Sequence, residues 1–247
     1  MSTPRPAPDV AESVALAING QPALAGFASP GERAQPLNLP PWFIDRCRQA
    51  YLSLPVITGG EYANRLIGVS SASHHEGKTS IAAGIATAIA VDTGERTLLM
   101  ECDFSSRRGI GEIFRLRAGT GLAEWMSGDA DLRLVRASPF DNAFLLPAGG
   151  VGMDAARLMY RLGDHDVIGQ LRSSFRNIVI DLPPMNDIAY SSLAGRLADH
   201  VLLVVQYGRT TVEDLEKAMF LLGRDRVGGV ILNRFEPSIP RALRRLL

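Results

Sequence analysis

The stretch "SASHHEGKTS", Ser71–Ser80, ends in Gly77, Lys78 and Thr79, the order found at the end of a phosphate-binding loop. The apolar run "RLIGVSS" precedes it, and the Ala-rich run "TSIAAGIATAIAVDTG" follows it. A strand, this kind of loop and then a helix form the context that a Walker A motif requires. The stretch therefore predicts a nucleotide-binding α/β domain.

Backbone N–H groups and two side chains carry the chemistry expected of this loop. Free N–H groups of the loop and of the first helical turn converge on a phosphate, and the helix dipole favours its charge by up to about 2 kcal/mol. Lys78 is expected to neutralise the β- and γ-phosphate oxygens, and the Thr79 hydroxyl to bind Mg²⁺. The predicted nucleotide-contacting residues are Ala72, His75, Glu76, Gly77, Lys78, Thr79, Ser80 and Asn233.

The loop departs from the pattern G-x-x-x-x-G-K-[ST] at its start and in its middle. Ala72 takes the place of the first glycine, which is a small change. His75 stands where such loops often have glycine, and a residue with a Cβ costs about 1–2 kcal/mol there if its φ is positive. We interpret His74 and His75 as tolerated loop substitutions without catalytic duty.

Three carboxylates follow later apolar runs. Glu101 and Asp103, in "LLMECDFSSRR", are two residues apart, so on a continuing strand both face the ligand edge of the sheet. There they are expected to hold Mg²⁺ or to accept a proton from an incoming hydroxyl, although ordinary strand-end polarity is an alternative. Asp181, in "NIVIDLPP", follows its strand in the manner of a Walker B carboxylate. We predict Lys78, Asp103 and Glu101 as catalytic residues and Thr79, Asp103 and Asp181 as the metal site.

Strand-like apolar runs alternate with longer helical patterns from Asn64 onward, which is typical of βαβ units. The expected strands are "RLIGVSS", "RTLLMEC", "AFLLPAG", "NIVIDLP", "DHVLLVVQYG" and "VGGVILN". The expected helices are "TSIAAGIATAIAVDTG", "DAARLMYRLGDHDVIGQLRSS" and "TVEDLEKAMFLLGR". We predict a doubly wound, mostly parallel sheet with helices on both faces and ligands at the carboxyl ends of its strands. Asn233 ends the last strand, where its amide is expected to meet an adenine edge or to serve as a plain turn residue.

Composition limits the partners. The 247 residues have a formal net charge of zero, so no nucleic-acid partner is expected. Cys47 and Cys102 form no C-x-x-C pair, which predicts neither a disulfide framework nor a zinc site and favours the cytoplasm. No apolar run approaches the roughly 18 residues of a membrane span, and the start lacks the apolar core of a signal peptide. Any membrane association is therefore expected to be peripheral or through a partner.

Proline-rich composition suggests the domain boundaries. Residues 1–41 are rich in alanine and proline, and proline removes backbone donors, so we predict a flexible arm or a plain spacer. The expected domain covers residues 42–237 and opens with a short helix in "WFIDRCRQAYLSL". Residues 238–247 form a short basic tail.

With these motifs the chain resembles the bacterial tyrosine kinase (BY-kinase) family of exopolysaccharide and capsule systems, within the MinD/ParA-like P-loop ATPases. The resemblance covers residues 49–237 and rests on "VSSASHHEGKTSIAAGIATAIA", "TLLMECDFSSRRG", "GLAEWMSGDADL", "NAFLLPAGG", "NIVIDLPP" and "GVILNR". It implies ATP and Mg²⁺ as ligands, with Lys78 and Thr79 as phosphate and metal residues. Asp103 and Asp181 match the second Walker A′ aspartate and the Walker B aspartate. The resemblance also implies that the chain is a cytoplasmic partner of a membrane polysaccharide copolymerase and controls polysaccharide chain length or export.

The chain departs from the family pattern at four places. The usual Pro-Gly-Glu-Gly of the loop is His-His-Glu-Gly here, and the first Walker A′ aspartate is Glu101. The ring-forming segment E-x-x-R-x-x-R reads "QAYLSLP", without either arginine, which argues against ring assembly of a homo-oligomer. After Asn233 the chain reads "RFEPSIPRALRRLL", without a tyrosine, so tyrosine autophosphorylation of this tail is chemically impossible.

The first functional hypothesis is an ATP-binding regulator of exopolysaccharide biosynthesis with slow or absent kinase activity. The enzyme activity expected of such a protein is ATP hydrolysis or phosphoryl transfer of the tyrosine-kinase kind. The second hypothesis is an active tyrosine kinase that acts on another protein. It requires the same site residues as the first hypothesis. A MinD/ParA-type spatial ATPase is the third, although that group normally has a lysine where this chain has Ser73. The fourth is a scaffold whose loop is closed to phosphates by His75.

Overall fold

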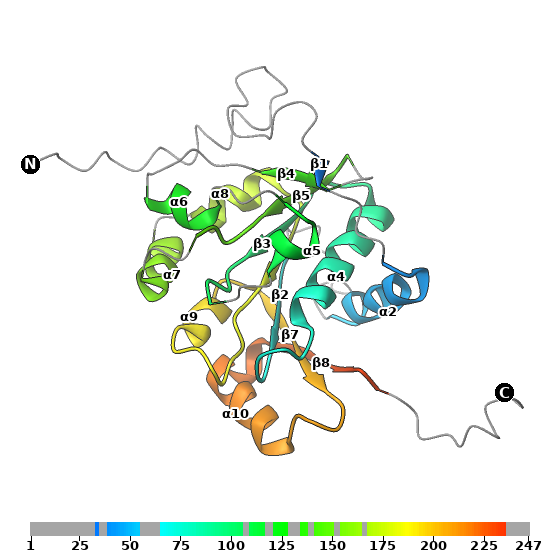
Figure 1. Cartoon of the computed structure of the whole chain (residues 1–247), viewed down its shortest axis with the longest axis vertical. Helices are drawn as coiled ribbons and strands as arrows, with labels where there is room; N and C mark the ends of the chain where they lie inside the picture. Colours follow the sequence, from blue (N-terminus) through cyan, green and yellow to red (C-terminus); the bar gives the residue numbers. More distant parts are fainter. Residues whose placement is uncertain are drawn as a thin grey trace, which may run out of the picture.

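Figure 1 shows the computed structural model of the chain, which describes residues 33–34, 39–54, 65–105, 109–116, 121–127, 134–137, 141–150, 154–164 and 167–235. Within these ranges eight strands form one sheet. Their bounds are β1 Arg33–Ala34, β2 Arg65–Ser71, β3 Thr97–Glu101, β4 Val135–Ala137, β5 Ala143–Leu146, β6 Asn177–Asp181, β7 His200–Gln206 and β8 Val227–Asn233.

The strands lie in the order β1-β4-β5-β3-β6-β2-β7-β8. All neighbouring pairs are parallel except the antiparallel pair β4 and β5. The predicted doubly wound, mostly parallel sheet is therefore confirmed. Because β3, β6, β2, β7 and β8 are parallel neighbours, their carboxyl ends meet at one edge, where ligands bind in folds of this kind.

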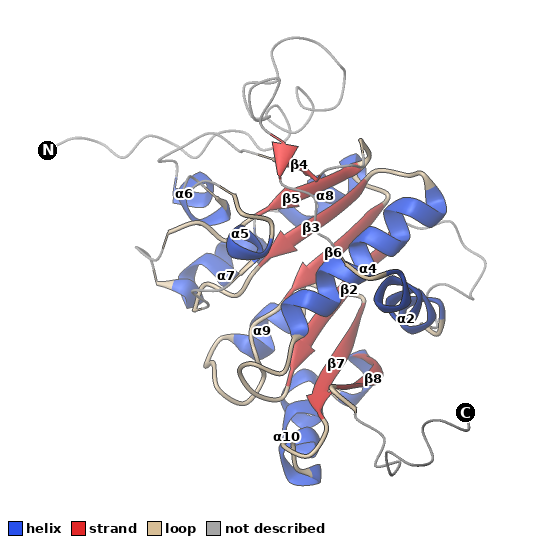
Figure 2. Cartoon of the chain, turned by 45° about the vertical axis from the view of Figure 1, so that its right-hand side comes forward, coloured by secondary structure: helices blue, strands red, loops and turns tan. Residues whose placement is uncertain are grey.

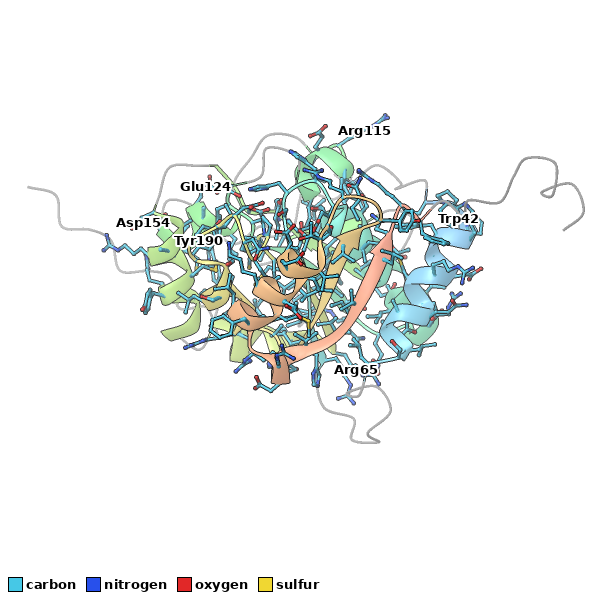
Figure 3. The ribbon with its side chains drawn as sticks, turned by 90° about the horizontal axis from the view of Figure 1, so that it is seen from below. Trp42, Arg65, Arg115, Glu124, Asp154 and Tyr190 are labelled. Atoms are coloured by element: carbon cyan, nitrogen blue, oxygen red, sulfur yellow. The ribbon has the colours of Figure 1, made fainter. Side chains whose placement is uncertain are left out.

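Helices cover both faces of this sheet (Figure 2). Their bounds are α2 Pro41–Leu52, α4 Lys78–Thr93, α5 Ile110–Ile113, α6 Leu122–Ser127, α7 Ala155–Asp164, α8 Val167–Ser174, α9 Ser191–Gly195 and α10 Val212–Leu222, with the 3-10 helix η1 at Arg224–Arg226. Buried side chains of α2, α4 and α5 form one core with their face of the sheet, and those of α6 to α10 form a second core on the other. Figure 3 shows this division from below, with Trp42 of α2 on one side and Glu124 of α6 and Tyr190 on the other.

Helix α4 fixes the position of the phosphate loop because it is buried along most of its length. Its residues are apolar almost all round, and it lies between the sheet and α2. A Cβ at Gly84 would come within 2.5 Å of the Cys47 sulfur and 2.8 Å of the Phe43 ring, so glycine permits the close approach of α2. Asp92 of α4 then accepts hydrogen bonds from Arg48, at 2.7 Å, and from the Tyr51 hydroxyl, also at 2.7 Å.

The structure corrects three details of the sequence prediction. The helix expected over residues 154–174 is two helices, α7 and α8, because Gly163 and Asp164 are weak helix formers at the point where α7 ends. Strands β1 and β4 were not predicted, since two or three residues are too short to show an alternating pattern. Strand β1 belongs to the predicted arm, and its Ala34 is buried. Residues 1–32 and 35–38 of that arm and the tail, 238–247, lie outside the described residues, so the domain boundaries stay a prediction.

Candidate functional site

The loop between β2 and α4 presents backbone donors at the carboxyl edge of the sheet. Gly77 has a φ of +97° and directly precedes Lys78, the first residue of α4. The first N–H groups of a helix have no acceptor within the helix, and no side chain caps this helix end. The first bond of the turn runs from the N–H of Ile81 to the Gly77 carbonyl, at 3.1 Å. This helix end is therefore open to an anion.

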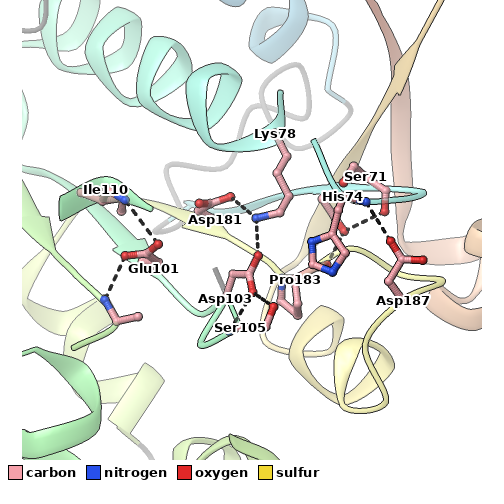
Figure 4. A network of polar contacts seen from close by, with 12 residues as sticks. Ser71, His74, Lys78, Glu101, Asp103, Ser105, Ile110, Asp181, Pro183 and Asp187 are labelled. Atoms are coloured by element: carbon pink, nitrogen blue, oxygen red, sulfur yellow. Dashed lines mark hydrogen bonds and ion pairs between the residues drawn. The ribbon is translucent and has the colours of Figure 1, made fainter. Parts of the chain in front are cut away.

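Lys78 lies between two buried carboxylates (Figure 4). Its Nζ is 2.8 Å from Oδ2 of Asp103 and 3.2 Å from Oδ1 of Asp181. Burial alone would lower the pKa of Lys78, but the charges of Asp181 and Asp103 raise it above its usual value. The lysine is therefore held as a cation that pairs with Asp181, the last residue of β6, and with Asp103, two residues beyond the end of β3.

The predicted metal residues Thr79, Asp103 and Asp181 come together around Lys78. Burial raises the pKa of Asp181, while the charge of Lys78 and the nearby Thr79 hydroxyl act in the opposite direction. Oδ1 of Asp103 accepts hydrogen bonds from the N–H of Ser105 at 3.1 Å and from its hydroxyl at 2.5 Å. Asp103 is therefore oriented from both of its oxygens.

Glu101 has different partners from Asp103, contrary to the expectation that the two carboxylates act side by side. Its oxygens accept hydrogen bonds from the N–H of Ile110 at 3.3 Å and of Ala148 at 3.1 Å. Strand β3 ends at Glu101, so the side-chain alternation of a strand does not extend to Asp103. Burial first, and then the charge of Asp181, raise the pKa of Glu101 to about 7. In this arrangement Glu101 ties α5 to the segment after β5, and its catalytic role stays a prediction.

Side chains from outside the loop hold its first half in place. The Glu76 carboxylate accepts hydrogen bonds from the N–H of Ser73, at 2.9 Å, and from the Thr210 hydroxyl. The N–H of His74 donates to Oδ2 of Asp187 at 2.8 Å. His75 is exposed and has a φ of 67°, so this histidine adopts the conformation that favours glycine.

Asn233 contacts the phosphate loop rather than standing free at the strand end. Its Nδ2 donates to the Glu76 carbonyl at 2.8 Å, and its Oδ1 accepts from the N–H of Arg234 at 2.9 Å. A Cβ on Gly77 would lie 2.3 Å from the same Nδ2. The structure therefore gives Asn233 a place beside the loop, and its contact with adenine stays a prediction.

Sequence patterns missed the residues that support the site. Asp187 and Thr210 reach the loop from the segments after β6 and β7, and no motif marks them. Glu124 of α6 accepts hydrogen bonds from the N–H groups of Gly121 and Gly150, at 2.7 and 2.6 Å, and so holds the double glycine of "NAFLLPAGG". The only sequence signal for such residues is that they follow an apolar strand, which places them at the carboxyl edge of the sheet. This signal does not show which residue each side chain contacts.

Two features are absent from the described part of the chain. No group of three or more His, Cys, Asp or Glu side chains in the described ranges is arranged to hold a metal ion by itself. Within the same part of the chain, no helix has the length and apolar character needed to cross a bilayer.

A strand, a glycine-containing loop with Lys78, and a helix that opens at the loop define a P-loop nucleotide-binding protein. No family model matches the chain. It is 31% identical over 181 residues to the tyrosine-protein kinase CpsD of Streptococcus pneumoniae serotype 4, which covers 71% of this chain and 78% of CpsD. It is also 31% identical over 199 residues to the succinoglycan biosynthesis transport protein ExoP of Rhizobium meliloti, of which it spans 25%. The chain therefore belongs to the bacterial tyrosine kinase family of exopolysaccharide and capsule systems.

Solved structures agree on the fold. The kinase domain of Escherichia coli tyrosine kinase ETK superposes with a TM-score of 0.68 at 19% identity, over 86% of this chain and 88% of that one. The septum site-determining protein MinD of Pyrococcus horikoshii, solved with Mg-ADP, gives 0.57 at 22% identity, over 72% and 74%. At these sequence identities, both structural matches support the P-loop fold and nothing further.

Proposed function

We propose that the chain is an ATP- and Mg²⁺-binding protein of bacterial exopolysaccharide biosynthesis, of the capsule or holdfast type. In this role it is cytoplasmic, lies at the inner face of the plasma membrane through a membrane polysaccharide copolymerase, and controls chain length or export. The relatives' names, a tyrosine-protein kinase and a succinoglycan transport protein, support a role in this process. Because no tyrosine follows Asn233 in this sequence, it acts without tyrosine phosphorylation of this tail.

The observation that carries the proposal is Lys78 between Asp103 and Asp181, directly beneath the open end of α4. In the absence of phosphate, the lysine is neutralised by the two aspartates. An incoming triphosphate offers the lysine stronger anionic partners and meets the free N–H groups at the same point. Lys78 would then leave at least one carboxylate, which becomes available to other ligands.

The residues present fit a magnesium ion that is shared with the nucleotide. Oδ2 of Asp181 is buried and has no hydrogen-bond partner among the described residues. Thr79 and Asp103 lie at the same point of the sheet edge, and the lack of a complete protein ligand set is ordinary, because Mg²⁺ usually keeps waters and phosphate oxygens as ligands. When bound, the ion would neutralise charge that develops on the phosphates. Thr79, Asp103 and Asp181 would hold it.

Thermal unfolding with and without MgATP tests nucleotide binding. A ligand at a hundredfold excess over its Kd stabilises the folded state by about 2.7 kcal/mol. In a domain of this size each kcal/mol raises the Tm by roughly 2–4 °C, so MgATP should shift the Tm by several degrees. The shift should be lost in Lys78→Ala, measured against that variant's own ligand-free Tm. If millimolar MgATP produces no shift, the protein is a scaffold whose loop does not accept nucleotide.

The kinase that acts on another protein remains the second candidate. Asp103 is held beside Lys78 and Ser105, and a carboxylate next to the phosphate-binding lysine is the kind of group that accepts a hydroxyl proton. Incubation with labelled ATP and candidate partner proteins separates the two functions. Label transfer to tyrosine that disappears in Asp103→Asn supports the kinase. Of the described tyrosines, Tyr160 is 62% exposed, whereas Tyr51 is buried and hydrogen-bonded.

A spatial ATPase of the MinD/ParA type has weaker support. Ser73 takes the place of that group's early lysine, and its N–H bonds to Glu76 inside the loop. The cycle of a spatial ATPase depends on ATP hydrolysis. Steady-state release of phosphate that requires Lys78 would therefore favour a spatial ATPase over a regulator that only binds ATP. Copurification with a chain-length-type copolymerase from the producing cell would favour the regulator.

A further inference from the structure

The turn at His74 and His75 needs an explanation, since these residues replace a family Pro-Gly pair. Both lie in a turn, and His75 has a φ of 67°. Turns with a positive φ at the third position favour proline at the second position and glycine at the third. Proline has no N–H and a fixed φ, so a Pro-Gly turn would need no acceptor at its second position. His74 has an N–H at that position, which needs a hydrogen-bond acceptor. Its φ is also not fixed, as that of proline is.

The segment after β6 supplies the missing acceptor. It runs along the loop, where the N–H of Met185 donates to the Ser71 carbonyl at 2.8 Å and the N–H of Asn186 to the Ala72 carbonyl at 3.0 Å. The next residue, Asp187, continues this contact through its side chain, whose Oδ2 accepts the N–H of His74 at 2.8 Å (Figure 4). Three successive residues after the Walker B strand therefore bind the phosphate loop.

We infer that Asp187 is a positioning residue that holds the His74–His75 turn in the shape that accepts nucleotide. Its carboxylate replaces, through one hydrogen bond, the conformational restriction that proline would give. The inference rests on the proposed nucleotide binding and adds a residue outside the Walker motifs to it. Asp187 is exposed, so the bond is solvated and its effect on affinity is modest.

A cycle of variants tests this role through the Kd of MgATP measured by calorimetry on the full chain. Asp187→Ala should weaken binding about fivefold, because the turn loses its acceptor. Asp187→Asn keeps an acceptor oxygen without the charge and should bind within about twofold of the original chain. In a His74→Pro background the N–H no longer exists, so Asp187→Ala should change the Kd little.

The matched control is Asp154→Ala. Oδ1 of Asp154 accepts the N–H of Ala156 at 3.0 Å at the start of α7, so the same kind of bond is lost away from the loop. This variant should leave the Kd unchanged. A general loss of stability would lower the Tm of either variant but would not produce rescue of affinity by proline.

The outcomes separate the two proposals. If the original chain shows no Lys78-dependent MgATP binding, the proposed function fails and this inference fails with it. If the original chain binds but Asp187→Ala binds equally well or more tightly, the inference alone is wrong. It is also wrong if Asp187→Ala weakens binding equally in the original chain and in the His74→Pro background.

Discussion

The two halves of the phosphate loop are built differently. In the first, residues 73–76, polar groups are bound within the protein: Ser73 to Glu76, His74 to Asp187 and Glu76 to Thr210. In the second, residues 77–80, the open helix end has no side-chain cap, and the Lys78 side chain forms ion pairs with Asp103 and Asp181. Unusual residues are therefore tolerated in the half whose shape other segments fix, while the half that meets the ligand keeps the sequence G-K-T.

Lys78→Ala, in the second half of the loop, is expected to have the largest effect on the stability of the ligand-free protein. Removal of the lysine leaves the buried carboxylates of Asp103 and Asp181 without their cation, which should lower the free energy of unfolding by about 3 kcal/mol near pH 7.5. The pKa of Asp181, already raised by burial, rises further in the variant. The folded variant then holds a proton that the unfolded chain releases, so its stability should increase as the pH falls from 7.5 towards 5.

Denaturant unfolding at pH 7.5 and 5.5 measures both parts of this prediction. The deficit of Lys78→Ala relative to the original chain should be smaller at pH 5.5. Lys217→Ala, at an exposed position on α10, is the control and should show no deficit at either pH. An equal deficit at both values would mean that Asp181 does not take up the proton.

Glu76→Ala should have the next largest effect, and it probes the first half. Glu76 is 1% exposed, and its loss leaves the N–H of Ser73 and the Thr210 hydroxyl without their acceptor. We expect a loss of about 2 kcal/mol, which corresponds to a fall in Tm of roughly 4–8 °C. Glu76→Gln keeps one acceptor oxygen and should lose about half as much.

Glu213→Ala, at an exposed position in the first turn of α10, controls for the removal of a carboxylate. Differential scanning calorimetry of the three variants would measure the effects. A Tm of Glu76→Ala within about 1 °C of the control would show that the first half of the loop does not depend on this carboxylate.

Local pattern and long-range contact differ in how well the sequence predicts them. Strand β2 and the start of α4 follow from apolar runs and the G-K-T signature, and the structure has β2 at the predicted residues 65–71. The contacts of Asp187 with His74 and of Thr210 with Glu76 join residues 113 and 134 positions apart. No local pattern encodes such pairs, because they depend on the order of strands in the sheet. The expectation that Glu101 and Asp103 face the same side assumed a continuing strand. Strand β3 ends at Glu101, and the sequence pattern did not show that end point.

Gly77→Ala should have a smaller effect, at the boundary between the halves. Gly77 and Gly94 both have positive φ values, 97° and 66°, so alanine costs about 1 kcal/mol at either position. At Gly77 the new Cβ also meets Nδ2 of Asn233 at 2.3 Å, whereas nothing lies within 4 Å of a Cβ at Gly94. Gly77→Ala should therefore have a Tm a few degrees below that of Gly94→Ala. The difference should disappear in an Asn233→Ala background, and its persistence there would rule out the clash as its cause.

The smallest effect, a stabilisation, is expected from His75→Gly. His75 is exposed, has a φ of 67°, and pays about 1 kcal/mol for a conformation that glycine adopts freely. Part of this gain is offset by the greater freedom of glycine in the unfolded chain, so the Tm should rise by about 1–3 °C. His74 has no positive φ, and His74→Gly should lower the Tm instead. If the two glycine variants change the Tm in the same direction, the positive φ of His75 does not account for the difference between these two positions.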